Sequence, residues 1–201
     1  MEEQSKVILM FPVPVWVTPF NGEDYSSELE WIKNLEIKDN RVSVDNFVLD
    51  SPIMANIRSF IESTISKYTS QIWRYEQEFY ITQSWVNRKG KGDSHQVHTH
   101  PNSIISGVWY PQVTKDSCIL FQSLLENAIQ VEPVEWTEMN ADAYQLPVNM
   151  GDLILFPSYL QHCVPHPHSS DTERISLSFN TWIKGSLGTK EKLTYLPGKN
   201  F

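Results

Sequence analysis

The histidines are the residues whose type and spacing most directly suggest chemistry. All 6 lie between positions 95 and 168, in the segments SHQVHTHPNS and LQHCVPHPHSS. Histidine is the commonest metal-binding side chain in proteins. If His98 and His100 share a strand, their spacing of two places both imidazoles on one face, and His162 can supply a third ligand from another strand. The pattern predicts a metal site held by His98, His100 and His162.

The remaining histidines are weaker candidates for the metal site. His95 lies nearer the glycine-rich turn at 88–93, and an H-x-x-H spacing also occurs in metal sites. His166 and His168 alternate with prolines beside Ser and Asp, which is typical of a solvated loop. The carboxylates that could contribute a ligand instead are Asp93, Asp116 and Asp152. Asp152 directly follows Gly151 and is more simply a turn residue.

A second group of polar residues lies in ERISLSFNTW, where polar and apolar side chains alternate. One face carries Arg174, Ser176, Ser178 and Asn180, and the other carries Ile175, Leu177 and Phe179. Arg174 could hold a carboxylate through two parallel hydrogen bonds, and Ser176 could add a third. The alternative is a half-exposed strand with its polar face in water. The position of Arg174 shortly after His162 favours the carboxylate site.

The elements that must position these residues are helices followed by many short strands. The sequence predicts an extended edge segment at 6–19, where Pro12 and Pro14 occur, and helices at 25–35 and 52–69. The expected strands are 79–87, 102–112, 117–123, 152–160 and 173–183. This order favours an antiparallel jelly roll with helices on one side. We expect one domain over 1–201, with supporting elements at 1–75, the jelly-roll core at 76–183 and a tail at 184–201.

Composition excludes several classes of protein. The 16 basic and 24 acidic residues give a formal charge of -8, which disfavours a general nucleic-acid-binding surface. The longest apolar runs are interrupted by prolines and are too short to span a bilayer. Cys118 and Cys163 form no disulfide framework, and Cys163 is expected to pack away from the metal. These features predict a cytoplasmic protein that does not bind membranes.

Three blocks together resemble the iron(II) and 2-oxoglutarate-dependent oxygenases. They are HTHPNSIISGVWY, GDLILFPSYLQHCVPH and RISLSFN, and they look especially like a group of members from marine bacteria and phages. The resemblance implies a double-stranded β-helix, the cupin-like form of the jelly roll, with His98 and His162 as iron ligands. It further implies that Arg174 and Ser176 bind the distal carboxylate of 2-oxoglutarate, and that a substrate is hydroxylated with release of succinate and CO2.

The sequence departs from the family pattern at one ligand. Most members carry Asp or Glu two residues after the first histidine, where this chain has His100. A site of three neutral imidazoles should depend strongly on the 2-oxoglutarate dianion, and it could also suit Zn²⁺. Further candidate co-substrate residues are Tyr110 and Asn102. Candidate pocket residues are Trp85, Asn87, Ser106 and Asn180.

Two other functions remain open at this point. One is a cupin-like metal enzyme with three histidines that does not use 2-oxoglutarate, either a Zn²⁺ hydrolase or an Fe²⁺ dioxygenase acting directly on its substrate. The other is a non-catalytic jelly-roll binding protein. The sequence identifies no particular small-molecule or peptide substrate. The acidic stretch 124–149 is either a lid or a solvated loop, and the tail packs on the barrel or on the second subunit of a homodimer.

Overall fold

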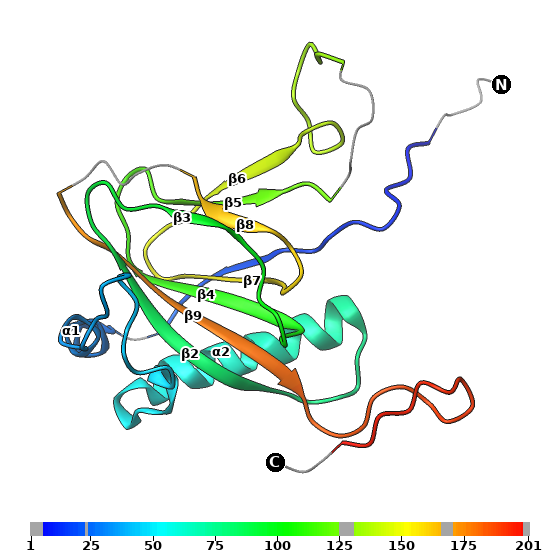
Figure 1. The fold of residues 1–201 in the computed structure, drawn as a ribbon, viewed down its shortest axis with the longest axis horizontal. Helices are drawn as coiled ribbons and strands as arrows, with labels where there is room; N and C mark the ends of the chain where they lie inside the picture. The colour runs from blue at the N-terminus through cyan, green and yellow to red at the C-terminus, as the bar shows by residue number, and fades with distance from the viewer. Residues whose placement is uncertain (1–5, 23, 125–130, 166–170, 199–201) are drawn as a thin grey trace.

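The computed structural model describes residues 6–22, 24–124, 131–165 and 171–198 (Figure 1). The strands are β1 (Trp16–Pro19), β2 (Phe79–Lys89), β3 (His95–His98), β4 (Ile105–Gln112), β5 (Cys118–Gln122), β6 (Ala143–Pro147), β7 (Asp152–Pro157), β8 (His162–Val164) and β9 (Arg174–Ile183). The α-helices are α1 (Ser26–Lys33) and α2 (Ala55–Tyr68). Short 3-10 turns at Val48–Asp50 and Pro52–Met54 precede α2, and a π-helical turn at Thr69–Trp73 follows it.

The strands form two antiparallel sheets that face each other. The five-stranded sheet has the order β1-β7-β4-β9-β2, and the four-stranded sheet has the order β3-β8-β5-β6. Figure 1 shows the smaller sheet lying over one face of the larger one. The expected jelly-roll architecture with flanking helices is therefore confirmed.

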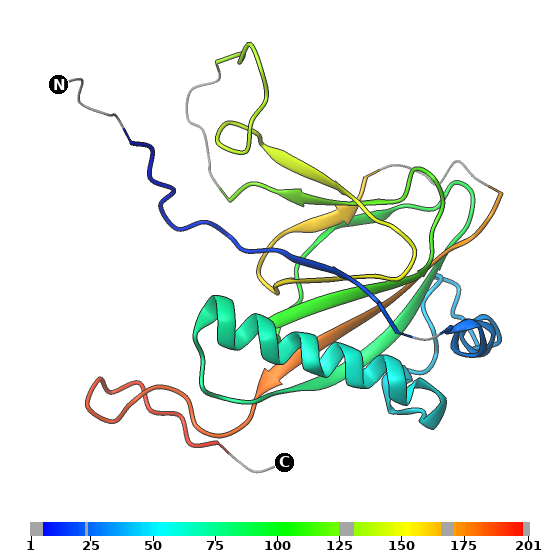
Figure 2. The same cartoon turned by 180° about the vertical axis from the view of Figure 1, so that it is seen from behind.

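Helix α2 covers the outer face of the five-stranded sheet. Ile57, Ile61 and Ile65 recur at helical spacing, and all three are buried against the sheet. Figure 2 shows α2 crossing β4, β9 and β2 on the side away from the smaller sheet. The helix begins at Ala55, after the Pro52–Met54 turn, rather than at the predicted residue 52.

The alternation of side chains along each strand separates a helix-side core from the space between the sheets. On β9, Ile175, Leu177 and Phe179 belong to the helix-side core. Their polar neighbours therefore point to the opposite face, towards the smaller sheet. Trp85 and Lys89 on β2 alternate in the same way with Val86, which lies in the helix-side core. The functional candidates on both strands thus face the space between the sheets.

A glycine allows close packing at the centre of the larger sheet. Gly107 on β4 lies opposite Leu155 of β7 and Phe179 of β9. A Cβ atom at this position would lie 2.2 Å from Phe179 Cζ and 2.7 Å from Leu155 Cδ2. A larger residue there would force the Phe179 or Leu155 side chain, or the strand itself, to shift.

Two strands lie where the sequence did not indicate them. Strand β6 lies inside the acidic stretch 124–149, and it pairs with β5 at the edge of the smaller sheet. Strand β3 ends at His98, so His100 lies just beyond it rather than on the same strand. The predicted extended segment 6–19 forms a strand only over Trp16–Pro19, which pairs with β7.

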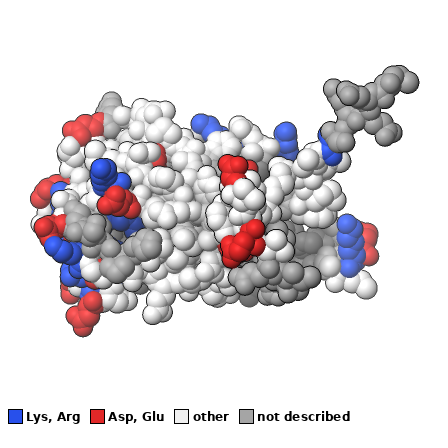
Figure 3. All heavy atoms as spheres, turned by 90° about the horizontal axis from the view of Figure 1, so that it is seen from above, with Lys and Arg blue, Asp and Glu red and all other residues white. Residues whose placement is uncertain are grey.

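The surface of the described part of the chain carries mixed charge. On the face in Figure 3, Lys and Arg lie beside Asp and Glu near one end, and most of the remaining face is uncharged. Apolar side chains are exposed along the N-terminal segment, including Ile8, Met10 and Phe11. Among the described residues, no helix combines the length and the apolar character needed to cross a bilayer.

Candidate active site

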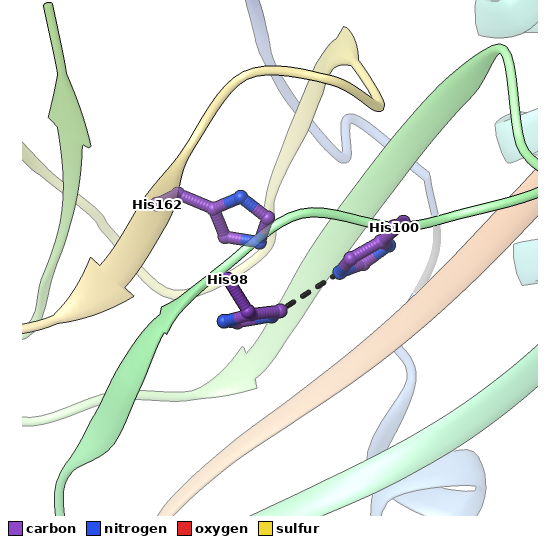
Figure 4. Close-up of side chains that lie close together, drawn as sticks. All are labelled: His98, His100 and His162. Atoms are coloured by element: carbon purple, nitrogen blue, oxygen red, sulfur yellow. Dashed lines mark hydrogen bonds between the residues drawn. The ribbon is translucent and has the colours of Figure 1, made fainter.

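Three imidazoles converge between the two sheets (Figure 4). His98 is the last residue of β3, His162 is the first of β8, and the two pair directly across the strands. One candidate ligand atom from each of His98, His100 and His162 lies within 4.8 Å of the other two. Nε2 of His98 and Nε2 of His100 are 3.3 Å apart. Two imidazoles bound to one ion at about 2.1 Å place their nitrogens roughly 3.0–3.4 Å apart, so this pair already has the separation of adjacent ligands.

A hydrogen bond at the other ring nitrogen orients each of these imidazoles. Nδ1 of His98 is 2.8 Å from Gln96 O, and Nδ1 of His162 is 2.9 Å from Leu160 O. Nδ1 of His100 is 2.6 Å from Oδ1 of Asn180. A carbonyl oxygen can only accept, so each Nδ1 carries the proton and each Nε2 keeps its lone pair. All three rings are therefore in the tautomer that a metal ion needs.

Serine side chains hold the Asn180 carboxamide behind His100. The Ser106 hydroxyl donates to Asn180 Oδ1 at 2.9 Å, and it contacts Ser158 Oγ at 2.8 Å. The backbone N–H of His100 donates to Ser158 O at 2.9 Å. Sequence reasoning placed Ser106 and Asn180 in the pocket, but the structure places them behind the His100 ring. Their contacts fix the position of this ring relative to the larger sheet.

Burial keeps His95, His100 and His162 uncharged. Burial lowers the pKa of His162 to about 3, against the small opposing effect of its bond to Leu160. The pKa of His95 falls to about 4, chiefly through burial and secondly through the nearby charge of His98. The pKa of His100 is also lowered by burial. At neutral pH these rings are neutral, so a cation does not have to displace a proton from them.

The three histidines open into a cavity between the two sheets. Five of the predicted site residues line it, namely Trp85, Asn87, Tyr110, Arg174 and Ser176. The structure thus brings residues from β2, β4 and β9 together beside the histidines.

Arg174 lines this cavity and forms no ion pair with any of the described residues. Its side chain is buried, Nη2 donates to Cys118 O at 3.3 Å, and Nε has no partner among the described residues. The guanidinium carbon lies 5.1 Å from the centre of the Tyr110 ring. Burial raises the pKa of the Tyr110 hydroxyl to about 12, so it stays protonated and can donate a hydrogen bond. Arg174 and Tyr110 together present donors to an anion.

One expectation about an individual residue does not match the structure. Asn102 lies in an exposed turn with φ 57 and is not among the residues that line the cavity. The strand begins at Ile105, so this asparagine adopts the left-handed turn conformation that its side chain tolerates. Cys163 was expected to face away from the metal, and it is buried opposite Leu120 on the face of β8 that His162 does not share.

The other candidate metal ligands form hydrogen bonds elsewhere, are exposed, lie outside the histidine cluster, or fall outside the described residues. Asp93 accepts from the Gly90 backbone N–H at 2.8 Å, and Asp152 accepts from the Asn149 backbone N–H at 2.7 Å as a turn residue. Asp116 is exposed. His95 stacks on His98 with ring centres 4.3 Å apart, but it is not in the ligand cluster. His166 and His168 fall outside the described ranges.

Sequence reasoning missed Lys89, which lines the cavity and is only 8 % exposed. Its ammonium pKa is lowered, mainly by burial; the charges of Arg174 and Arg41 also lower it, and that of Asp93 opposes them. The predicted strand ended at residue 87, whereas β2 continues to Lys89. Continuing the alternation of Trp85 and Asn87 by two residues would have placed Lys89 on the same face.

The donor set of the cluster fits iron(II). Imidazole nitrogen is a suitable ligand for Fe²⁺ and for Zn²⁺. The site is partly enclosed, since His100 and His162 are buried and His98 is half-buried. Three protein ligands leave coordination positions for other groups. The cluster can therefore hold a metal ion that also binds a small molecule.

Comparison with solved structures gives the same fold. An oxidoreductase of the 2OG-Fe(II) oxygenase family from Burkholderia pseudomallei is 15% identical, with a TM-score of 0.59 and coverage of 83% of this chain and 83% of that chain. HygX from Streptomyces hygroscopicus with nickel and 2-oxoglutarate bound is 12% identical, with a TM-score of 0.58 and coverage of 84% and 81%. A prolyl-4-hydroxylase from Pseudomonas putida is 12% identical, with a TM-score of 0.56 and coverage of 85% and 92%. At these identities the likeness establishes the fold, a double-stranded β-helix.

Comparison of the sequence with protein families identifies one family. None of the curated proteins matches the chain. The family model described as "Putative 2OG-Fe(II) oxygenase" matches residues 83–180, which include the three clustered histidines and Arg174. Neither comparison bears on an origin in marine bacteria or phages. By this match residues 83–180 belong to the 2OG-Fe(II) oxygenase family, and the fold agrees with it.

Proposed function

We propose that the protein is an iron(II)- and 2-oxoglutarate-dependent dioxygenase that hydroxylates a small-molecule or peptide substrate. The observation that carries the proposal is the convergence of three imidazoles, each with Nδ1 donating to a carbonyl oxygen and Nε2 free. In this proposal His98, His100 and His162 hold the metal. Family membership supports iron and 2-oxoglutarate as the cofactor and the co-substrate.

The chemistry would come from the bound iron and co-substrate. Iron(II) with 2-oxoglutarate and O2 supplies oxidative decarboxylation, in which succinate and CO2 are released and one oxygen atom enters a substrate C–H bond. The residues of this chain bind and orient the reactants. Arg174 and Ser176 would hold the distal carboxylate of the co-substrate, with Tyr110 donating from the adjacent strand β4. Trp85 and Asn87 would line the space beside it.

Because His100 stands where a carboxylate ligand would carry a negative charge, the three protein ligands of this site are all neutral. Three neutral imidazoles leave the full +2 charge of Fe²⁺ in a partly buried cavity, where uncompensated charge is costly. The carboxylate of 2-oxoglutarate that Arg174 does not hold would cancel part of that charge. We therefore expect iron to be held more tightly when the co-substrate is present.

Anaerobic visible absorption of Fe²⁺-loaded protein tests the proposal. Titration with 2-oxoglutarate should produce a saturable metal-to-ligand charge-transfer band, and addition of O2 should yield succinate. A protein that binds metal stoichiometrically but shows neither signal would contradict the proposal. That result would favour a three-histidine metal enzyme acting without 2-oxoglutarate, for which the His100 position and the affinity of Zn²⁺ for three histidines are the supporting features.

A further inference from the structure

Lys89 and Arg174 form a pair of buried cations at one end of the cavity. They are direct partners in the antiparallel register of β2 and β9, which lie side by side in Figure 1. Directly opposed residues in such a pair project to the same face of the sheet. Lys89 is 8 % exposed and Arg174 is 5 % exposed, and both line the cavity that the histidines share.

No acidic side chain forms an ion pair with either of these cations within the described ranges. The lining residues of the cavity in this part of the chain include no Asp or Glu, and neither cation forms an ion pair there. Asp93 acts on Lys89 through its charge, but its carboxylate is bound to the Gly90 N–H at 2.8 Å and pairs with Arg41 at 3.4 Å. Burying two cations without a counter-ion is costly, so the pair is arranged for an anion from outside.

The guanidinium group of Arg174 and the ammonium group of Lys89 can together bind a single carboxylate. The guanidinium presents parallel donors that match both oxygens of a carboxylate, and the ammonium is a compact charge with donors in several directions. Two oxygens offer about four lone-pair sites, so one carboxylate can accept from both cations at once. Because the two strands fix the backbones opposite each other, both heads can reach the same anion.

We propose that Lys89 acts with Arg174 in binding the distal carboxylate of 2-oxoglutarate, as a second residue that determines co-substrate specificity. The inference rests on the proposed function, in which Arg174 holds this carboxylate. It adds a second cation, from a different strand, to the binding of that carboxylate. Lys89 contributes this charge from β2, the strand at the edge of the larger sheet.

Two 2-oxo acids that differ only at the distal carboxylate distinguish the proposed role of Lys89 from a general effect on the cavity. The probes are 2-oxoglutarate and 2-oxopentanoate, in which a methyl group replaces the distal carboxylate. Calorimetric titration of nickel-loaded protein measures the affinity for each acid without turnover. The variants are Lys89→Met, which keeps the length of the side chain but removes its charge, and Lys89→Arg, which keeps the charge. Lys91→Met is the matched control, since Lys91 lies nearby but is exposed and pairs with Asp171.

Lys89→Met should weaken 2-oxoglutarate binding by roughly ten- to a hundred-fold, the worth of a hydrogen bond to a charged group. It should leave 2-oxopentanoate binding unchanged. Lys89→Arg should retain most of the affinity for 2-oxoglutarate, and Lys91→Met all of it. Each variant is first shown to bind nickel stoichiometrically, which confirms that it is folded.

Equal effects of Lys89→Met on both acids, or no effect on either, would overturn the inference. If Arg174→Ala weakens 2-oxoglutarate binding while Lys89→Met does not, the proposed function stands and only the role of Lys89 is refuted. If the wild-type protein binds nickel but not 2-oxoglutarate, the proposed function itself fails.

Discussion

Nδ1 of His100 lies 2.6 Å from Oδ1 of Asn180, although 80 positions separate the two residues in the sequence. His100 follows β3 of the smaller sheet, whereas Asn180 lies on β9 of the larger one. The contact therefore sets the direction of one metal-facing ring from the opposite sheet. Residues that hold metal ligands in place affect metal affinity without touching the ion.

Replacing Asn180 with alanine should weaken metal binding by about 10- to 100-fold, because His100 loses the acceptor that fixes its tautomer and direction. Competition with a chelator measures this affinity. Ser178→Ala is the control, since Ser178 lies on the same strand and bonds to Asn87 rather than to a histidine. Equal metal affinity of Asn180→Ala and wild type would show that the contact does not orient the ligand.

Removal of either His98 or His162 should abolish stoichiometric metal binding, because two neutral ligands hold a divalent ion poorly. His95→Ala is the matched control: this imidazole stacks on His98 but lies outside the cluster, so its loss should leave metal content unchanged. Metal analysis of the purified variants gives the answer. A variant of His98 or His162 that keeps a full complement of metal would exclude that residue from the ligand set.

Arg174→Ala should leave the metal in place and reduce 2-oxoglutarate affinity by about 2–5 kcal/mol, the cost of truncating one partner of a buried charge pair. The charge-transfer band of the Fe²⁺ protein, titrated anaerobically, reports this affinity. Tyr110→Phe removes only the hydroxyl of the ring over which the same guanidinium lies, and it should have a smaller effect. Unchanged affinity in Arg174→Ala would refute the carboxylate site.

The metal-free protein should lose stability as the pH falls. Burial holds the pKa of His162 at about 3 and that of His95 at about 4, both below the value of about 6.5 that is usual for histidine. Between about pH 6.5 and pH 3 the unfolded chain binds more protons than the folded chain. The stability that these two neutral imidazoles contribute is therefore fully present above about pH 6.5 and is lost as the pH falls towards 3. The slope reaches at most about 1.4 kcal/mol per pH unit for each group.

Urea unfolding of the metal-free protein at a series of pH values measures this slope. His162→Gln, which cannot titrate, should flatten the lower part of the profile. A stability profile that is identical in wild type and His162→Gln would contradict the prediction.

Gly107→Ala should destabilise the fold by about 1–3 kcal/mol, because the added methyl group overlaps Phe179 and Leu155. Urea unfolding measures the change. Gly90→Ala is the control, since a Cβ there would meet only Asp93 Oδ2, at 3.8 Å. Similar stabilities of the two variants would indicate that β4 moves to accept the methyl group.

The features of the site that could be predicted from sequence are those that local spacing determines. The histidine clusters and the alternation after Arg174 place His98, His162 and Arg174 on definite faces of short strands. The isoleucines of α2 follow the helical period, so its position was also accessible. Three cavity-lining residues, Trp85, Asn87 and Tyr110, lie on strands whose alternation was visible in the sequence.

The rest depends on contacts between strands that are distant in the sequence. Lys89 becomes significant only through its register with Arg174, and Asn180 only through its contact with His100. Asn102 was placed on a strand because the apolar run begins nearby, but the chain turns there before the ladder starts. Strand β6 is mostly exposed, so it has no apolar alternation to reveal it.

The hydrogen bond between His100 and Asn180 has a consequence for the mechanics of the fold. His98 and His162 lie on the four-stranded sheet, while His100 is joined through Asn180 to the five-stranded one. An ion held by all three imidazoles would tie the two layers of the β-helix together. Binding to the folded state alone raises its stability. Loading with metal should therefore slow amide hydrogen exchange in β3 and β8, so that the same ion would act as a structural cross-link as well as a reaction centre.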